Sequence, residues 1–140
     1  MVDFTSKFGR AVKKHLKEQY VIWLTTVDSY LTPQPRPVWF IWENNSFLIF
    51  SQAKAHKVKH IARNPKVALH FNTDQTGDKH VIVFTGEASI QTNGPPAHEV
   101  AAYFTKYKDG IANLGMTPQK FSREYSTAIK IKATEVRGWE

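Results

Sequence analysis

The residues of this 140-residue chain that could do chemistry gather between positions 54 and 63. Apolar residues recur there at helical spacing, so the segment predicts a short amphipathic helix that Pro65 ends. Its other face is basic and carries Lys54, His56, Lys57, Lys59, His60 and Arg63. The helix begins just after Ser51 and Gln52, where unpaired amide groups, the helix dipole and lysine side chains could together bind a phosphate. A solvated basic face is the alternative interpretation.

The sequence offers little other catalytic machinery. Only His56 and His60 share a helical face, and neither a thiolate nor a nearby carboxylate accompanies them, so we expect no metal site. The chain has no cysteine, which excludes disulfides and cysteine nucleophiles. It also lacks the glycine-rich phosphate loops and the GxSxG motif. An enzyme built on this chain would therefore take its chemistry from a bound cofactor.

Length and charge narrow the class of protein. At 140 residues the chain is the size of a single domain, expected over 1–140, and a hydrophobic fraction of 41% is ordinary for a globular protein. The net charge of +7 favours an anionic partner, which could be nucleic acid, a membrane surface or a phosphorylated small molecule.

The N-terminal segment predicts an amphipathic helix over residues 4–19, with lysines and one arginine opposite its apolar stripe. Such a helix can lie on a membrane, but covering a core is the commoner use and the one we expect. The chain has neither an apolar run long enough to span a membrane nor the apolar core of a signal peptide. A cytoplasmic protein is expected.

Strands dominate the first half of the chain. Residues 20–27 are rich in β-branched and aromatic side chains, and residues 33–37 must be extended, with an unpaired edge, because alternate positions are proline. Segments 38–42 and 47–50 follow, joined by a turn at residues 43–45. Both are apolar on both faces, which indicates a barrel interior on one side and a helix or second subunit on the other.

The second half completes an antiparallel barrel with appended helices. Strands are predicted over residues 67–72, 81–90 and 128–136, and Gly86 indicates a bulge in the middle one. Helices are expected from residue 97 to about 111 and from Thr117 to residue 125, the latter with Phe121 buried. About six strands result, without the strand and helix alternation of a parallel sheet.

Several segments carry a family resemblance. PVWFIW (37–42), FLIFSQ (47–52), HKVKHIARNP (56–65) and VALHF (67–71) resemble the pyridoxamine 5'-phosphate oxidase-like split β-barrel flavoproteins. AYFTKY (102–107), LGMTPQKF (114–121) and EYSTAIKIKATEVRGW (124–139) are similar to the F420 (deazaflavin)-dependent subgroup. The resemblance implies a mainly β, six-stranded antiparallel split barrel that forms a homodimer, with FMN or F420 at the subunit interface.

The resemblance also implies site residues. Lys57 matches the family's phosphate-binding lysine, and Ser51 a second phosphate contact. The backbone along the isoalloxazine ring falls on three consecutive residues, Pro37, Val38 and Trp39, and Trp139 is a candidate contribution from the other subunit.

Two candidate residues depart from the family pattern. His60 stands where asparagine is expected, and Lys54 stands in a segment that is usually Pro-Gly-like, so both alter the expected phosphate contacts. The chain does not resemble the longer true oxidases throughout, so pyridoxal synthesis is not implied.

Together these features predict a flavin-type oxidoreductase that moves hydride to or from a small molecule, with no catalytic side chain required. A non-catalytic cofactor-binding or stress protein of the same fold is the first alternative. A nucleic-acid-binding barrel is disfavoured because the aromatic residues lie in strands buried on both faces, so neither nucleic acid nor a membrane is an expected partner. A haem-binding relative, with His56, His60 or His70 as ligand, is a further alternative.

Overall fold

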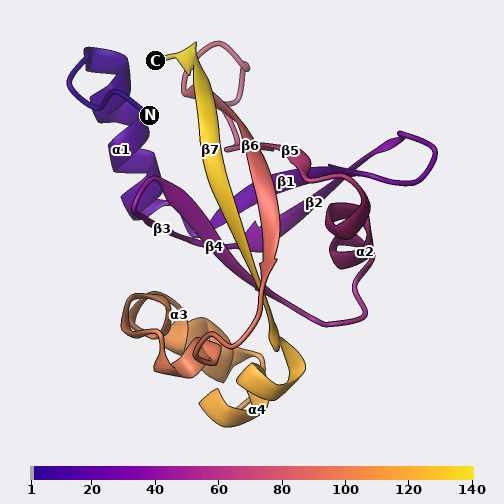
Figure 1. Ribbon diagram of the computed structural model, residues 1–140. Coiled ribbons are helices and arrows are strands. Elements are labelled where there is room, and N and C mark those ends of the chain that lie inside the picture. Colours follow the sequence, from indigo (N-terminus) through magenta and orange to yellow (C-terminus); the bar gives the residue numbers. More distant parts are fainter. Residues whose placement is uncertain (1) are drawn as a thin grey trace.

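Seven strands form one antiparallel sheet in the order β2-β1-β5-β6-β7-β4-β3 in the computed structural model, which describes residues 2–140 (Figure 1). The strands are β1 (Val21–Val27), β2 (Pro33–Trp39), β3 (Ile41–Glu43), β4 (Ser46–Ser51), β5 (Lys66–His70), β6 (Val81–Gln91) and β7 (Thr127–Trp139). The helices are α1 (Lys7–Glu18), α2 (His56–Arg63), the 3₁₀ turn η1 (Ala97–Glu99), α3 (Ala101–Asn113) and α4 (Pro118–Glu124).

The curled sheet has an apolar cluster on each face. The inner cluster holds Phe47 and Ile49 of β4, and the outer cluster holds Phe50 of the same strand together with aromatic residues of α3 and α4. Successive side chains of a strand point to opposite faces, so β4 contributes to both clusters. The predicted two-sided burial of this strand is confirmed, with helices supplying the outer cover.

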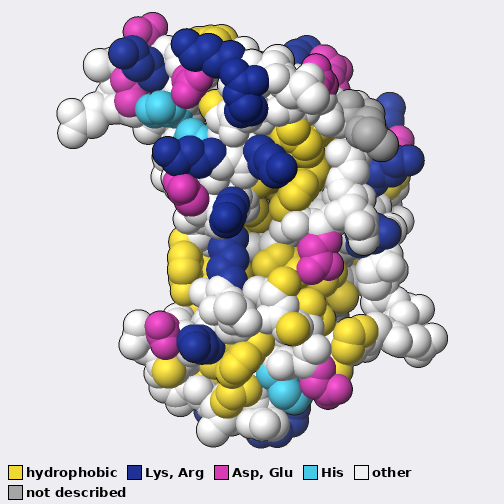
Figure 2. Space-filling view, turned by 90° about the vertical axis from the view of Figure 1, so that its left-hand side faces the viewer, with side chains coloured by type: hydrophobic (Ala, Val, Ile, Leu, Met, Phe, Trp, Pro, Cys, Tyr) yellow, Lys and Arg dark blue, Asp and Glu magenta, His cyan; other side chains and the backbone are white. Residues whose placement is uncertain are grey.

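The helix α1 closes one end of the inner cluster through Val12 and Leu16. Ser6 caps it by accepting a hydrogen bond from the Gly9 N–H at 2.9 Å. Figure 2, seen from the side of α1, shows Lys and Arg side chains gathered over the upper part of this face. The helix therefore covers the core with one side and exposes charge on the other, as expected. No helix in residues 2–140 is long and apolar enough to cross a membrane.

The barrel expected from the sequence is confirmed, with seven strands where about six were expected. The extra strand arises because the extended segment is interrupted at Phe40, between β2 and β3. The Tyr107 hydroxyl of α3 accepts the Phe40 N–H at 2.8 Å and lies 2.9 Å from the Phe40 carbonyl oxygen. Both backbone groups of Phe40 are thus satisfied by a helix instead of a neighbouring strand, so the chain can bend there.

Three local predictions concern the bulge at Gly86, the Thr117 cap of α4 and the start of the third helix. The β6 and β7 register shifts between Thr85 and Gly86, and a Cβ on Gly86 would lie 2.7 Å from the Lys132 carbonyl oxygen, so the predicted bulge is confirmed. Thr117 caps α4 by accepting from the Lys120 N–H at 3.1 Å, as predicted. The third helix differs: a 3₁₀ turn occupies its first residues, and α3 itself begins at Ala101.

Candidate functional site

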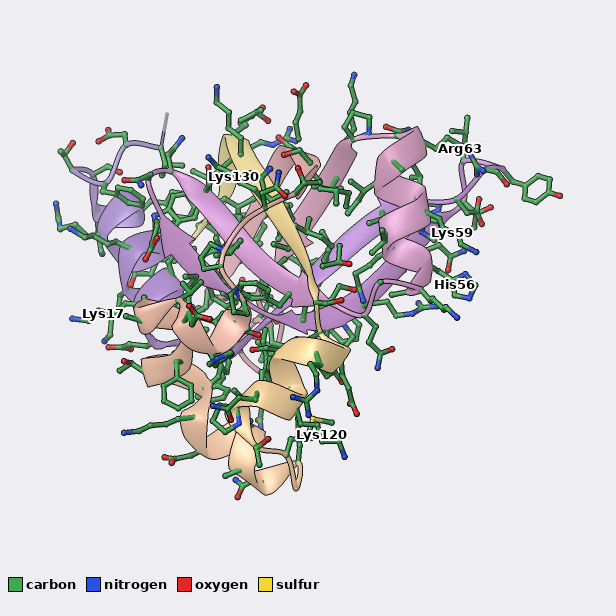
Figure 3. All side chains as sticks on the ribbon, turned by 60° about the horizontal axis from the view of Figure 1, so that its bottom comes forward. Lys17, His56, Lys59, Arg63, Lys120 and Lys130 are labelled. Atoms are coloured by element: carbon green, nitrogen blue, oxygen red, sulfur yellow. The ribbon has the colours of Figure 1, made fainter. Side chains whose placement is uncertain are left out.

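A hollow of about 210 Å³ lies where α2 meets the edge of the sheet formed by β1 and β2. We name it the cation cavity, and its lining residues are Thr26, Gln34, Arg36, Pro37, His56, Lys57 and His60. Figure 3 shows α2 beside this edge, with His56, Lys59 and Arg63 labelled along the helix. One arginine, one lysine and two histidines face this hollow, and no carboxylate lines it.

The cavity exists because the inner face of β1 and β2 changes from apolar to polar along the strands. Ile22 pairs with Val38, and both belong to the inner cluster. The next inward pair places Leu24 opposite Arg36, and the pair after that places Thr26 opposite Gln34. Side chains two residues apart share a strand face, so the apolar interior grades into a polar mouth at the end that α2 covers.

Lys57 is the half-buried cation of this cavity. Burial lowers its pKa, and the positive charge of Arg36 lowers the pKa further. In residues 2–140 no hydrogen-bond acceptor and no carboxylate partner is found for the Lys57 ammonium group. Arg36 uses one guanidinium nitrogen to donate to the Pro35 carbonyl oxygen at 2.7 Å, which orients the side chain. Two neighbouring positive charges with unused donors are the chemistry that an anion requires.

The histidine His60 is held in place by a buried hydroxyl. Its Nδ1 lies 2.8 Å from the Thr26 Oγ, and the Thr26 residue is only 2% exposed. The rings of His56 and His60 stack at 6.3 Å between centroids on the same side of α2. The carboxylate of Asp28, which feels the charge of His60, is engaged by Gln34 Nε2 at 3.1 Å and by backbone N–H groups of its own turn. The donor set of the cavity therefore fits a phosphate.

Three of the predicted cofactor residues line the cation cavity: Pro37, Lys57 and His60. The others lie elsewhere. Ser51 is 3% exposed, with its Oγ donating to the Gln52 carbonyl oxygen at 3.1 Å. Gln52 and Lys54 are exposed in the loop before α2, outside the lining.

Three further predicted cofactor residues, Val38, Trp39 and Trp139, do not line the cation cavity. Val38 is buried in the inner cluster. Trp39 stacks on Tyr107 with ring centroids 4.6 Å apart and planes 5° from parallel, so one ring face is used within the chain. Trp139 is 55% exposed at the end of β7, where its indole N–H donates to the Asp78 carbonyl oxygen at 2.6 Å. Within one chain, Trp139 does not line the cation cavity.

Four lining residues were not among the predicted cofactor contacts: Thr26, Gln34, Arg36 and His56. His56 was assigned to the basic helix face and considered as a haem ligand. A signal for Arg36 was present, since an arginine two residues before an inward valine falls on the inner face of the strand.

The comparisons with known proteins establish the family. The pyridoxamine 5'-phosphate oxidase family profile matches residues 8–140, so the chain belongs to this family. Over 72 residues it is 38% identical to pyridoxine/pyridoxamine 5'-phosphate oxidase 2 of Hydrogenovibrio crunogenus, an alignment covering 51% of this chain and 34% of that protein. The chain thus spans about a third of the length of this curated relative.

Solved structures share the split-barrel fold at low identity. A conserved hypothetical protein from Mycobacterium tuberculosis matches with a TM-score of 0.75 and 18% identity, covering 97% of this chain and 85% of the other. An F420 reductase matches with a TM-score of 0.65 and 21% identity, covering 89% and 94%. At these identities the likeness shows the fold alone.

Proposed function

We propose that the cation cavity binds the phosphate-bearing end of FMN or coenzyme F420, and that the chain is an oxidoreductase acting on a small molecule. The observation that carries the proposal is the half-buried Lys57, which lacks a partner in residues 2–140 and lies beside Arg36 in a cavity without carboxylates. Among proteins of this fold, one is an F420 reductase and another is a FAD-binding protein from Mesorhizobium loti, which supports a flavin-type ligand.

The residues of the cavity have distinct roles in this proposal. The cofactor, when bound, supplies hydride transfer, and the chain binds and orients it. Arg36 presents a planar fork that can contact two phosphate oxygens, whereas Lys57 acts as a point charge. Thr26 fixes the ring of His60 through their hydrogen bond, so that the other ring nitrogen keeps one direction.

A homodimer belongs to the same proposal. On the face opposite the inner cluster, the cross-strand row Trp23, His70 and Val83 points outward and is partly exposed, and Trp23 stacks on His70. A second copy packed on this row would bury it. Trp139, remote from the cation cavity of its own chain, would then be available to the partner's cofactor. Sedimentation equilibrium tests this: Trp23→Glu is expected to convert a dimer to monomer, and a wild-type monomer would contradict the proposal.

Haem is the competing ligand. One protein of this fold is the heme storage protein HutZ from Vibrio cholerae, and His56 and His60 line the cation cavity of this chain. A general stress protein of Bacillus anthracis has the fold as well, so binding without turnover is the other alternative.

The deciding experiment titrates cofactor-free protein separately with FMN, F420 and hemin, followed by fluorescence and absorbance. Saturable binding of FMN or F420 that weakens in Lys57→Met, and not in the exposed-lysine control Lys59→Met, is the expected result. A Soret band with hemin, without FMN or F420 binding, would replace the flavin proposal with the haem one. Reduction of the bound cofactor by a donor, followed by turnover of a substrate library, then separates an enzyme from a binding protein.

A further inference from the structure

A second hollow, larger than the cation cavity, lies on the outer face of the sheet. It has a volume of about 320 Å³, and we name it the outer cleft. Its floor is formed by β4 and β7, and its roof by the segment 91–100, which connects β6 through η1 to α3. No residue lines both hollows. Figure 3 shows Lys130 on β7 well apart from the labelled residues of α2.

Most of the cleft wall is apolar. Leu48 and Phe50 of β4 and Ala128 of β7 form the floor, while Pro95 and Val100 contribute to the roof. Proline has no backbone N–H, so the roof at Pro95 offers no donor from the main chain there. Figure 2 shows hydrophobic side chains exposed on the side of the molecule where β3 and β4 lie. A wall of this kind binds the apolar body of a ligand.

The strand register gives the cleft one unpaired cation. Lys132 lies opposite Glu87 of β6, so its charge has an oppositely charged neighbour across the strands. Lys130, two residues earlier on the same face, lies between Leu48 of β4 and Ser89 of β6. In residues 2–140 Lys130 forms no ion pair, including with Glu43 at the rim of the cleft.

We propose that the outer cleft binds a small organic acid, with its apolar body on Leu48, Phe50 and Ala128 and its carboxylate at Lys130. Among the described residues, Lys130 is the one cation of a cleft that Glu43 also lines, so the cleft favours no more than a monoanion, whereas a phosphate would find more positive charge in the cation cavity. A volume near the lower limit for ligand pockets restricts the ligand to a body of roughly ten to fifteen non-hydrogen atoms. This inference does not rest on the proposed cofactor, because the two hollows share no residue.

The test uses octanoate and its uncharged analogue 1-octanol as probes. Each is titrated into the ¹⁵N-labelled full chain, and amide shifts are followed by NMR. Octanoate is expected to shift amides of Leu48, Ala128 and Val100 in a saturable way. Lys130→Met should weaken octanoate binding about tenfold and leave 1-octanol binding unchanged, because a charged contact is lost while the apolar wall remains. The matched control Lys132→Met, whose lysine faces Glu87, should change octanoate affinity less than twofold.

Three outcomes would overturn the proposal. Octanoate could leave the amides of the cleft unshifted, as it would if a second copy of the chain filled the cleft. Lys130→Met and Lys132→Met could weaken octanoate equally, which would indicate attraction by net charge only. Alternatively, 1-octanol could bind as tightly as octanoate, and Lys130→Met could leave octanoate binding unchanged. The variant Lys57→Met, which should impair the cation cavity, is expected to leave octanoate binding intact, so failure of one proposal is distinguishable from failure of the other.

Discussion

Two half-buried lysines on different helices show how α2 and α3 differ. Lys106 of α3 donates to the Phe40 carbonyl oxygen at 2.9 Å and lies 3.8 Å from the centre of the Phe40 ring. Lys57 of α2 has no such acceptor in the described chain, and its charged neighbour is Arg36. Burial lowers the pKa of both ammonium groups, to about 8 for Lys106. Lys106 thus bonds within the fold, whereas Lys57 is the residue that we propose binds a ligand.

The same contrast extends to the rest of each helix. The side of α3 facing the sheet buries Tyr103, Tyr107 and Ile111, while α2 buries only Ile61. The Lys106 ammonium group and the Tyr107 hydroxyl of α3 bond to backbone groups of Tyr20 and Phe40, so that helix defines the bend between β2 and β3. The polar atoms of α2 border a cavity. Among these atoms, the Lys57 ammonium group is only half-buried, so it keeps access to water and to a ligand.

The largest effect on stability is expected at Tyr107. Replacing it by phenylalanine removes the acceptor of the buried Phe40 N–H and the single hydroxyl proton that lies within reach of the Tyr20 carbonyl oxygen at 2.7 Å and the Phe40 carbonyl oxygen at 2.9 Å. The free energy of unfolding in urea should fall by about 2–3 kcal/mol. Tyr103→Phe is the matched control, since the Tyr103 hydroxyl makes no protein hydrogen bond in residues 2–140, and it should cost less than about 1 kcal/mol. Equal losses in both variants would remove the special role given to α3.

The corresponding change on α2 should affect ligand binding and spare stability. Lys57→Met is expected to weaken FMN or F420 binding by about 1.5–3 kcal/mol, roughly ten- to a hundredfold, because a charged phosphate contact is lost. Its free energy of unfolding should stay the same or rise, since a half-buried charge without an acceptor is removed. Calorimetric titration and urea unfolding measure the two quantities, and Lys59→Met on the exposed side of α2 serves as control. A destabilised Lys57→Met variant would mean that the lysine has a structural role after all.

The sequence predicts the fold well because its local signals agree with the final topology. The proline-rich segment is an edge strand, Gly86 sits at a bulge, and β4 is buried on both faces, each for the reason read from residue types. The interruption at Phe40 escaped prediction because it depends on a hydroxyl 67 residues further along the chain. No local propensity encodes such a contact.

The residues of the candidate site that lie on α2 could be predicted from the sequence. Those that β1 and β2 bring to the cation cavity were harder to find. Lys57 and His60 lie on the basic face of one helix that the sequence predicts, and the family resemblance points to Lys57 as a phosphate contact and to His60 as a departure at the same site. Thr26 and Arg36 join the cation cavity through the pairing of β1 with β2, and their partners become apparent only with the register. Trp39 was expected beside the isoalloxazine ring of the cofactor. The packing of its side chain on Tyr107 could not be anticipated without knowing where α3 docks.

A smaller effect is expected from the hydroxyl that orients His60. Thr26→Val keeps the shape of the side chain and removes the hydrogen bond to the histidine Nδ1. Cofactor affinity should fall by about 1 kcal/mol, because the ring must then be ordered when the ligand binds. Thr25→Val, on the opposite face of β1, should leave the affinity unchanged. An unaltered affinity in Thr26→Val would show that His60 does not take part in binding.

The last prediction is a pH dependence of stability, and it tests Lys106 directly. Its pKa is lowered from 10.5 to about 8 in the folded chain, so between these values the unfolded chain binds more protons than the folded one. The free energy of unfolding should therefore rise as the pH increases from about 8 towards 10. Above about pH 10 the trend should reverse, because burial raises the pKa of Tyr103 and Tyr107, and the unfolded chain releases those protons first. Urea unfolding of Lys106→Met should show a shallower rise, the remainder coming from the lowered pKa of Lys57. A rise as steep as in the wild type would show that the Lys106 ammonium group keeps its ordinary pKa. The two lysines would then differ in their pKa values as well as in their hydrogen-bond partners.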